Sequence, residues 1–455
     1  MATFKTGFNF HLLAVTTVGL LCIVPHIKAN VGTNGNNSVV LIKDKVENPI
    51  LVCYWGTWSH YRLGAGQFRV ENIDPNLCTH LVYSFFLLEE ATSKVTYADA
   101  WLDLPSTYPG GGLDNIRKTI ALRQGNRNLK ITMAIGGWNE GSIKYSNMAA
   151  DPAKRQVFIS SIIEMIQLWD FDGIDMDWEY PGKRGGLAED KQNFVLLLKE
   201  LREALDQVAR PGKDPLLLTS AFGCGQDTID AAYDVPEISK YIDYFHLMLY
   251  DFKVYIDPST PDFQPGGNLI GHHSPLYYKP LEDSTNQALT VSFAVETFIE
   301  LGAPPEKLVI GVGTYGKTFR LYNESMHNFY DVAIGPGAAG DFTLEAGTNT
   351  YYEICLEIQR NRDEWKIGFD TDYSVPYAYS KTKWIGYDNE ISAKAKVDYG
   401  MAKGVGGMMV WSLDFDDFGN HCGGWNGFPI VNAIKDRQAL HRGKFQKQKE
   451  SSKNT

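Results

Sequence analysis

Short apolar segments rich in β-branched and aromatic residues recur along the chain, separated by longer amphipathic segments. In segments such as residues 156–169 and 193–205, apolar side chains recur at helical spacing. Strands that alternate with helices indicate a parallel sheet, and eight such units predict an α/β fold, a closed TIM (β/α)8 barrel. The predicted barrel strands are residues 51–55, 79–86, 129–135, 173–178, 216–221, 244–249, 308–312 and 407–413.

The spacing breaks once, between the seventh and eighth apolar segments, which lie about a hundred residues apart. Residues 315–383 contain a β-prone segment at 342–344 and a helical one at 351–360. We therefore predict a small α+β insertion domain between strand 7 and strand 8, within a barrel that spans residues 49–434.

The two ends of the chain differ from its body. Residues 1–29 carry Lys5, an apolar run and a small residue, Ala29, which is typical of a signal peptide cleaved near that position. The run is shorter than the ~20 residues that span a bilayer, so secretion is favoured over a membrane anchor. Residues 30–48 are rich in Asn and Gly and predict a flexible lead-in, and residues 435–455 predict a solvated, basic, polar tail.

Net charge and aromatic content narrow the classes of partner. A formal net charge of -11 at pH 7 argues against nucleic acid and favours a neutral substrate. Aromatic residues make up 13% of the chain, which fits either large core side chains or platforms for sugar rings. Sequons begin at Asn36 and Asn323 and suit glycosylation of a secreted protein.

Six cysteines become five once Cys22 leaves with the signal peptide. In an oxidising compartment we expect two disulfides, and Cys224 is then left as a small buried hydrophobe or a reactive thiol. No CxxC or HxxxH spacing occurs, so no metal site is predicted. The expected pairs are Cys53 with Cys78, joining the first two strands, and Cys355 with Cys422.

Residues 171–181 crowd four carboxylates and three aromatic residues into one predicted strand. Alternate side chains of a strand share a face, so Asp175, Asp177 and Glu179 form a column of three acids. Three carboxylates this close together cannot all stay ionised, so their pKa values are expected to differ. Enzymes that cleave acetal bonds by general acid catalysis commonly use carboxyl groups with different pKa values. Asp172 is out of register and is expected to support the strand, form a salt bridge or cap a turn.

Several motifs resemble one enzyme family. The segment at residues 172–179 matches the DxxDxDxE signature of the family 18 glycoside hydrolases, and the likeness runs from about residue 51 to residue 430. Within that family the chain resembles secreted animal chitinases of the arthropod type. The supporting motifs are Ala-Ile-Gly-Gly-Trp at 134–138, Met-Leu-Tyr-Asp at 248–251 and Met-Val-Trp-Ser-Leu-Asp at 409–414.

The resemblance implies a substrate-assisted mechanism that needs no second carboxylate as nucleophile, no metal and no organic cofactor. Glu179 lies nearest the C-terminal end of its strand and is the candidate general acid. Asp177 stabilises the acetamide of the substrate, while Asp177 and the deeper Asp175 keep Glu179 protonated by like-charge coupling. Tyr250 and Asp251 hold the acetamide in place.

The resemblance also implies a sugar-binding groove. Trp411 forms its floor, Met248 lies near the acetamide methyl group, and Gly137 belongs to the third-strand motif. Two positions depart from the family pattern. Phe252-Lys253 stands where the family has a His-Gly pair, and Lys317 stands where the family often has an arginine. The lysine ammonium is a point charge, whereas an arginine guanidinium could form two parallel hydrogen bonds to a sugar. The expected groove walls are Trp138, Tyr54, Trp58, Tyr315 and Trp384.

Together these features predict a secreted, monomeric endo-chitinase that hydrolyses β-1,4 bonds of chitin and chitooligosaccharides with retention, without nucleic acid or membrane partners. One alternative is a non-catalytic chitinase-like lectin or signalling protein, which Glu179 argues against because such relatives lose that acid. Another is an endo-β-N-acetylglucosaminidase acting on N-glycans, which the altered residues after Asp251 leave open.

Overall fold

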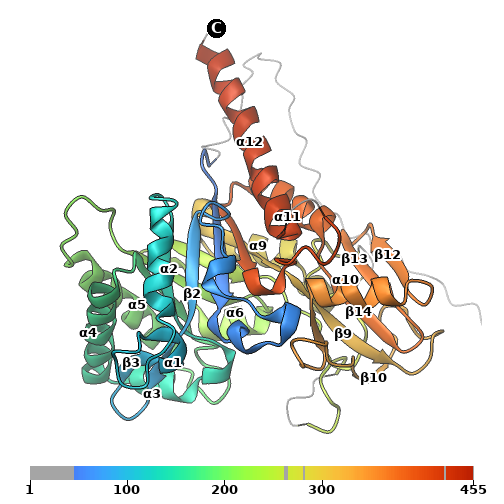
Figure 1. Cartoon of the computed structure of the whole chain (residues 1–455), viewed down its shortest axis with the longest axis horizontal. Coiled ribbons are helices and arrows are strands. Elements are labelled where there is room, and N and C mark those ends of the chain that lie inside the picture. Colours follow the sequence, from blue (N-terminus) through green and yellow to red (C-terminus); the bar gives the residue numbers. More distant parts are fainter. Residues whose placement is uncertain (1–45, 261–264, 280–281, 425–426, 454–455) are drawn as a thin grey trace, which may run out of the picture. The chain divides into compact units, whose positions relative to one another are not determined.

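The computed structural model describes residues 46–260, 265–279, 282–424 and 427–453, with side chains up to residue 443 (Figure 1). The predicted signal peptide, Asn36 and all but the end of the predicted lead-in lie outside the described residues. Within the described residues, no helix combines the length and the apolar character needed to cross a membrane.

Eight parallel strands close into a barrel, which confirms the predicted TIM fold. The sheet runs in the order β1-β15-β8-β7-β6-β5-β4-β2, and β1 also pairs with β2, so no edge remains. A ninth strand, β3 (Lys94–Tyr97), extends β2 in antiparallel fashion. The barrel strands are β1 (Ile50–Gly56), β2 (His80–Glu89), β4 (Lys130–Gly136), β5 (Gly173–Asp177), β6 (Leu217–Gly223), β7 (Tyr244–Met248), β8 (Leu308–Gly313) and β15 (Gly407–Trp411).

Helices lie on the outside of the barrel, as Figure 1 shows for α4 and α5. Helix α4 begins where Asp151 accepts hydrogen bonds from two backbone N–H groups and Pro152 occupies the first turn, and it ends at Asp170 in the left-handed conformation. The barrel-associated helices are α1 (Ala100–Asp103), α2 (Asn115–Ala121), α3 (Ile143–Ala150), α4 (Pro152–Trp169), α5 (Asp190–Asp206), α6 (Gln226–Ala232), α7 (Val235–Ile238), α8 (Ser284–Gln287), α9 (Val291–Glu300) and α11 (Glu390–Lys403).

The pleat of the strands separates two apolar layers. Outward side chains such as Ile174 and Met176 join the large core between strands and helices. Inward side chains such as Val52, Val82 and Met409 form a small cluster inside the barrel. Asp175 and Asp177 alternate with the outward residues of β5 and therefore point into the barrel.

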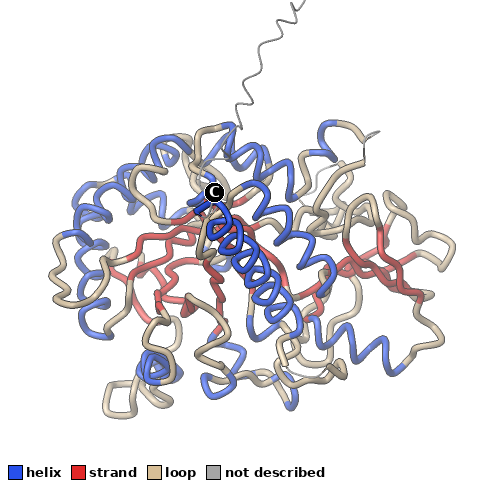
Figure 2. The backbone as a smooth tube through the Cα atoms, turned by 90° about the horizontal axis from the view of Figure 1, so that it is seen from above, coloured by secondary structure: helices blue, strands red, loops and turns tan. Residues whose placement is uncertain are grey.

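The insertion folds as an antiparallel sheet with one helix, α10 (Tyr351–Arg360), seen beside the barrel in Figures 1 and 2. The sheet extends past the predicted boundary at residue 383, because β14 hydrogen-bonds between β9 and β13. Residues 342–344 do not form the expected β segment: Phe342 and Thr343 lie in a turn whose backbone N–H groups the Glu353 carboxylate accepts, and the N–H of Leu344 donates to the carbonyl of Gly340. Its strands are β9 (Tyr315–Leu321), β10 (Ala333–Pro336), β11 (Thr348–Thr350), β12 (Lys366–Asp370), β13 (Val375–Tyr379) and β14 (Lys383–Tyr387).

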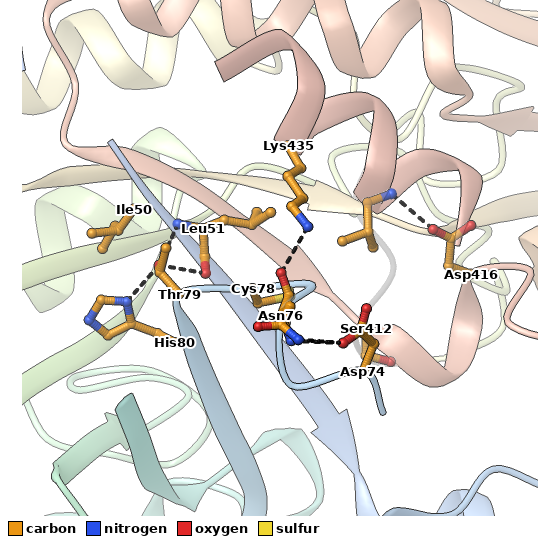
Figure 3. The surroundings of a disulfide bond; sticks show 12 residues. Ile50, Leu51, Asp74, Asn76, Cys78, Thr79, His80, Ser412, Asp416 and Lys435 are labelled. Atoms are coloured by element: carbon orange, nitrogen blue, oxygen red, sulfur yellow. Dashed lines mark hydrogen bonds between the residues drawn. A yellow bond between two sulfur atoms is a disulfide. The ribbon is translucent and has the colours of Figure 1, made fainter. Parts of the chain in front are cut away.

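Both predicted disulfides are present. Cys53 in β1 bonds to Cys78 just before β2, in the surroundings shown in Figure 3. Cys355 in α10 bonds to Cys422, which ties the insertion to the segment after the last barrel strand. Cys224 is free and buried, as expected of a small hydrophobic side chain.

The predicted solvated tail at residues 435–455 is wrong in its first part. Helix α12 (Pro429–Lys453) continues across that boundary. Lys435 donates to the carbonyl of Asn76 at 2.8 Å, as Figure 3 shows, and Gln438 is buried with its amide donating to the carbonyl of Ile50 at 3.0 Å. These contacts anchor the first turns of the helix to the N-terminal end of the barrel.

Candidate active site

Three carboxylates line up along the C-terminal half of β5 and the residues that follow it. Asp175 is fully buried, Asp177 is 4% exposed and Glu179 is 8% exposed. Asp175 lies opposite Thr219 of β6, and Asp177 lies opposite Gly136 of β4. Glu179, last in the column, is thus the acid nearest the open end of the barrel.

Asp175 is held by three side chains inside the barrel. Its carboxylate accepts hydrogen bonds from Thr219 Oγ1 and Tyr54 Oη, each at 2.6 Å, and His246 Nδ1 lies 2.9 Å away. The same ring nitrogen lies 2.8 Å from the Tyr54 hydroxyl. Burial alone would raise the pKa of Asp175, but the charge and hydrogen bond of His246, with Thr219 and Tyr54, lower it below the usual range. Asp175 is therefore the ionised member of the column.

Asp177 differs from Asp175 because its Oδ1 is buried and has no hydrogen-bond partner among the described residues. Burial, then the charges of Glu179 and Asp175, raise the pKa of Asp177 well above its ordinary value. Burial also raises the pKa of Glu179 to about 7, against the opposing effects of the Tyr180 hydroxyl and the Arg184 charge. Burial and like-charge repulsion thus favour the protonated forms of Asp177 and Glu179, whereas the partners of Asp175 favour its ionised form.

Asp172 lies at the opposite, N-terminal end of β5 and takes no part in the column. Arg123 pairs with its carboxylate, Arg210 donates to it at 2.9 Å, and it accepts the N–H of Ile131 at 2.9 Å. Burial opposes ionisation, but these partners lower the pKa of Asp172 overall. The sequence left open whether Asp172 supports the strand, forms a salt bridge or caps a turn, and the structure shows the salt bridge.

Tyr250 and Asp251 follow β7 and lie beside the column. Asp251 accepts a hydrogen bond from Tyr315 Oη at 2.6 Å, and Lys317 Nζ lies 3.3 Å from its other oxygen. His273 Nδ1 is 3.6 Å from the carboxylate. Burial opposes ionisation of Asp251, but Lys317, His273 and Tyr315 lower its pKa. Among the residues that the structure describes, the hydroxyl of Tyr250 has one hydrogen-bond contact, 3.8 Å from the sulfur of Met409, so it remains able to bond to a ligand.

Aromatic rings surround Trp411 at the end of β15. Phe85 stacks near it with ring centroids 5.8 Å apart, and Trp58 lies 6.2 Å away and stacks on Phe85 in turn. Tyr54 approaches from the barrel interior at 5.6 Å. Trp411 and the half-buried Met248 both pack against the cluster inside the barrel. Trp58 keeps 40% of its surface exposed, so this cluster presents aromatic surface to solvent.

Trp138 follows β4 and is 58% exposed. Gly137 donates its N–H to the carbonyl of Asp177 at 2.8 Å and has a φ of 95°. A Cβ there would lie 2.9 Å from the ring of Phe85, so only glycine fits. The guanidinium of Arg184 lies 3.6 Å from the centroid of the Trp138 ring. Gly137 thus brings Trp138 next to the end of the acid column.

Trp384 does not line this site, which corrects one predicted groove wall. It lies in β14, a central strand of the insertion sheet, and packs against Phe319 and Tyr377 with 1% of its surface exposed. Tyr54 and Tyr315 are also almost wholly buried, at 2% and 3%. The hydroxyl of Tyr54 donates to Asp175 and that of Tyr315 donates to Asp251, so these two tyrosines hold the acids and do not form the expected walls of a groove.

Several residues of the site were missed from sequence, among them His246, Thr219, Phe85 and Arg184. A signal existed for His246, because it precedes Met248 and Tyr250 by two and four residues on the same strand face. Thr219 and Phe85 come from other strands, and their contacts depend on barrel register. Among the described residues, no group of three or more His, Cys, Asp or Glu side chains could hold a metal ion.

Comparison with known proteins decides the family. The model of "Glycosyl hydrolases family 18" matches residues 50–416. The chain belongs to glycosyl hydrolase family 18. Within the family it is 39% identical over 392 residues to Probable chitinase 2 of Drosophila melanogaster, an alignment covering 85% of this chain and 76% of that protein.

Solved structures of family 18 members share the fold. The Group IV chitinase of Ostrinia furnacalis in complex with allosamidin has a TM-score of 0.78 and 38% identity, covering 86% of this chain and 99% of that one. Human YKL-39, described as a pseudo-chitinase with retained chitooligosaccharide binding, has a TM-score of 0.76 and 34% identity, covering 86% and 100%. The solved structures that resemble this chain therefore include one named a chitinase and one named a pseudo-chitinase.

Proposed function

We propose that this family 18 chain is a secreted endo-chitinase that cleaves β-1,4 bonds between N-acetylglucosamine units with retention of configuration. One observation carries the proposal: the buried column contains a terminal acid, Glu179, whose pKa is raised to about 7. A carboxylic acid that is still protonated near neutral pH can protonate a leaving group, which a lectin does not require.

In the proposed reaction, Glu179 donates its proton to the glycosidic oxygen as the bond from that oxygen to the anomeric carbon breaks. The 2-acetamido oxygen of the substrate attacks the same carbon and forms an oxazolinium ion. Glu179, now a carboxylate, takes a proton from water while the hydroxide adds to the anomeric carbon. The acetamide is regenerated, and the two displacements together retain the configuration.

Asp177 and Asp251 serve the acetamide group in this reaction. Asp177 has a buried carboxyl oxygen with no hydrogen-bond partner among the described residues, and this oxygen accepts the acetamide N–H. Tyr250, whose hydroxyl makes only a weak contact with sulfur, and Asp251 hold the acetamide in place. Trp411 packs under the reacting sugar, whose C–H face suits an aromatic ring.

Defined N-acetylglucosamine oligomers test the proposal. Purified protein should shorten oligomers of four to six units from internal bonds, and the new reducing ends should appear first as the β-anomer in proton NMR spectra. Glu179→Gln should retain binding and lose turnover. Binding without turnover in the parent protein would instead place the chain with YKL-39, and release of glycans from glycoproteins without cleavage of the oligomers would indicate the N-glycan alternative.

Secretion is tested on the full chain expressed in insect cells. The two disulfides fit an oxidising compartment, and Asn323 is exposed on the insertion. The protein should appear in the medium with its N-terminus near Asn30, and enzymatic deglycosylation should lower its mass. Retention in the cell with Met1 intact would contradict the proposal.

A further inference from the structure

Arg184 makes a set of contacts that the proposed reaction does not use. Its guanidinium lies over one face of the Trp138 ring, 3.6 Å from the centroid. One nitrogen of the same group donates to the backbone carbonyl of Trp138 at 2.8 Å and to that of Glu179 at 2.9 Å. A single side chain thus joins an exposed indole, the loop that carries it and the backbone of the candidate acid.

The backbone on both sides of this contact adopts conformations that need support. Trp138 is preceded by Gly137 and followed by Gly141, both at positive φ. Arg184 itself has a φ of 50°, which is unusual for a residue with a side chain. The stacking on Trp138 and the two hydrogen bonds of Arg184 add restraints to the ring and to its loop.

Most of the Trp138 side chain stays accessible. It is 58% exposed although the guanidinium of Arg184 lies over its ring. Arg184 therefore contacts the indole and still leaves more than half of the residue accessible to a ligand. An indole fixed in this way loses less conformational freedom when a sugar ring packs on it.

We propose that Arg184 is a positioning residue that fixes Trp138 as a platform for one N-acetylglucosamine unit of the substrate, next to the acid column. The proposal deepens the proposed function and rests on it. Arg184 does not touch the reacting atoms. It acts through Trp138 and through the backbone of Glu179.

Binding in a Glu179→Gln background tests the proposal without turnover. Arg184→Gln should raise the Kd for the hexamer of N-acetylglucosamine about fivefold, or about 1 kcal/mol, the size of a cation–π contact at an exposed site. Trp138→Ala should raise it at least as much, and adding Arg184→Gln to Trp138→Ala should change it little further. The control is Lys183→Gln, which removes a charge from the same loop where Lys183 pairs with Asp227 at 2.5 Å.

A second readout separates positioning from a structural role. In the parent background, Arg184→Gln should move the alkaline limb of kcat/KM to higher pH, because Arg184 lowers the pKa of Glu179. Arg184→Lys should restore that limb but not the Kd, since an ammonium keeps the charge and loses the planar fork.

The outcomes are distinct. The proposal for Arg184 is overturned if Arg184→Gln has the same Kd as its Glu179→Gln background. It is also overturned if Arg184→Gln raises the Kd just as much when Trp138 is already alanine. In both cases the proposed function still stands. If the Glu179→Gln parent binds no oligomer, the proposed function fails and this inference fails with it. Differential scanning fluorimetry should give all variants the unfolding temperature of the Lys183→Gln control within about 2 °C, the shift expected for a fraction of a kcal/mol. A larger drop confined to the Arg184 variants would assign the residue a purely structural role.

Discussion

His246 is the residue whose replacement tests the ordering of charges in the acid column most directly. It lies 2.9 Å from the fully buried carboxylate of Asp175, and its own ring is 2% exposed. Replacing His246 with Asn removes the one imidazole that faces Asp175 and leaves the hydrogen bonds from Thr219 and Tyr54. Asp175 then either stays ionised without its partner or takes up a proton.

Both routes destabilise the fold by an amount that can be worked out. An ionised carboxylate left unpaired in the interior costs about 3–5 kcal/mol. Protonation costs about 1.36 kcal/mol for each pH unit above the unfolded pKa of about 3.9, which gives about 1.5 kcal/mol at pH 5 and about 4 kcal/mol at pH 7. The parent has a depressed Asp175 pKa, so the stability that this carboxylate contributes is nearly complete by pH 5 and stays almost constant up to pH 7. The difference between parent and variant should therefore grow as pH rises from 4 to 7.

Urea unfolding at pH 5 and pH 7 measures this difference. His246→Asn should lose at least about 3 kcal/mol at pH 7 and clearly less at pH 5. The control is His80→Asn, because His80 lies at the N-terminal end of β2 and hydrogen-bonds to Thr79. A loss that is the same at both pH values would refute the assignment of Asp175 as an ionised group held by His246.

Three further predictions concern the acid, the cation beside Asp251 and the second disulfide. Glu179 must be protonated to act as the acid, so kcat/KM for a fluorogenic chitobioside should fall about tenfold per pH unit above about pH 7. A kcat/KM that stays constant up to pH 9 would contradict this role. Lys317→Met should raise the pKa of Asp251 and move the acid limb of the pH–activity profile to higher pH, whereas Lys317→Arg should leave that limb unchanged. Equal profiles for the two variants would show that the ion pair between Lys317 and Asp251 does not lower the pKa of Asp251. Replacing Cys355 and Cys422 with Ala should lower the free energy of unfolding by about 4 kcal/mol for a loop of 67 residues, and no change would show that the loop is ordered without the bond.

The barrel could be predicted from sequence because its evidence is repeated eight times. Each strand is a short apolar segment, and the residues between them carry helical periodicity, so errors at one boundary do not alter the fold. The ends of elements are different. Residues 342–344 have β propensity, yet Glu353 accepts the backbone N–H groups of Phe342 and Thr343 in a turn, a contact that the local sequence does not encode. Helix α12 continues past residue 435 because Gln438 packs against β1, which is remote in sequence.

The site could be predicted where one strand carries it. Asp175, Asp177 and Glu179 follow from period-two alternation alone. The prediction that Trp384 forms a groove wall was wrong, because an aromatic side chain in a β segment suits a sugar platform and a sheet core equally well. The position of β14 between β9 and β13 decides for the sheet core. Arg184 was missed because its contact joins two loops that follow different strands.

The structure also changes the explanation for the protonation of Glu179. From sequence, like-charge coupling along the column was expected to keep this acid protonated. In the structure the deepest carboxylate, Asp175, has a lowered pKa, and burial is the largest influence on both Glu179 and Asp177, with like-charge repulsion between these two adding to it. Depth therefore does not set the order of acidity; the hydrogen-bond partners of each carboxylate do. Burial and the charges of Glu179 and Asp175 raise the pKa of Asp177, and its Oδ1 has no hydrogen-bond partner among the described residues, so this carboxyl is able to turn toward a ligand.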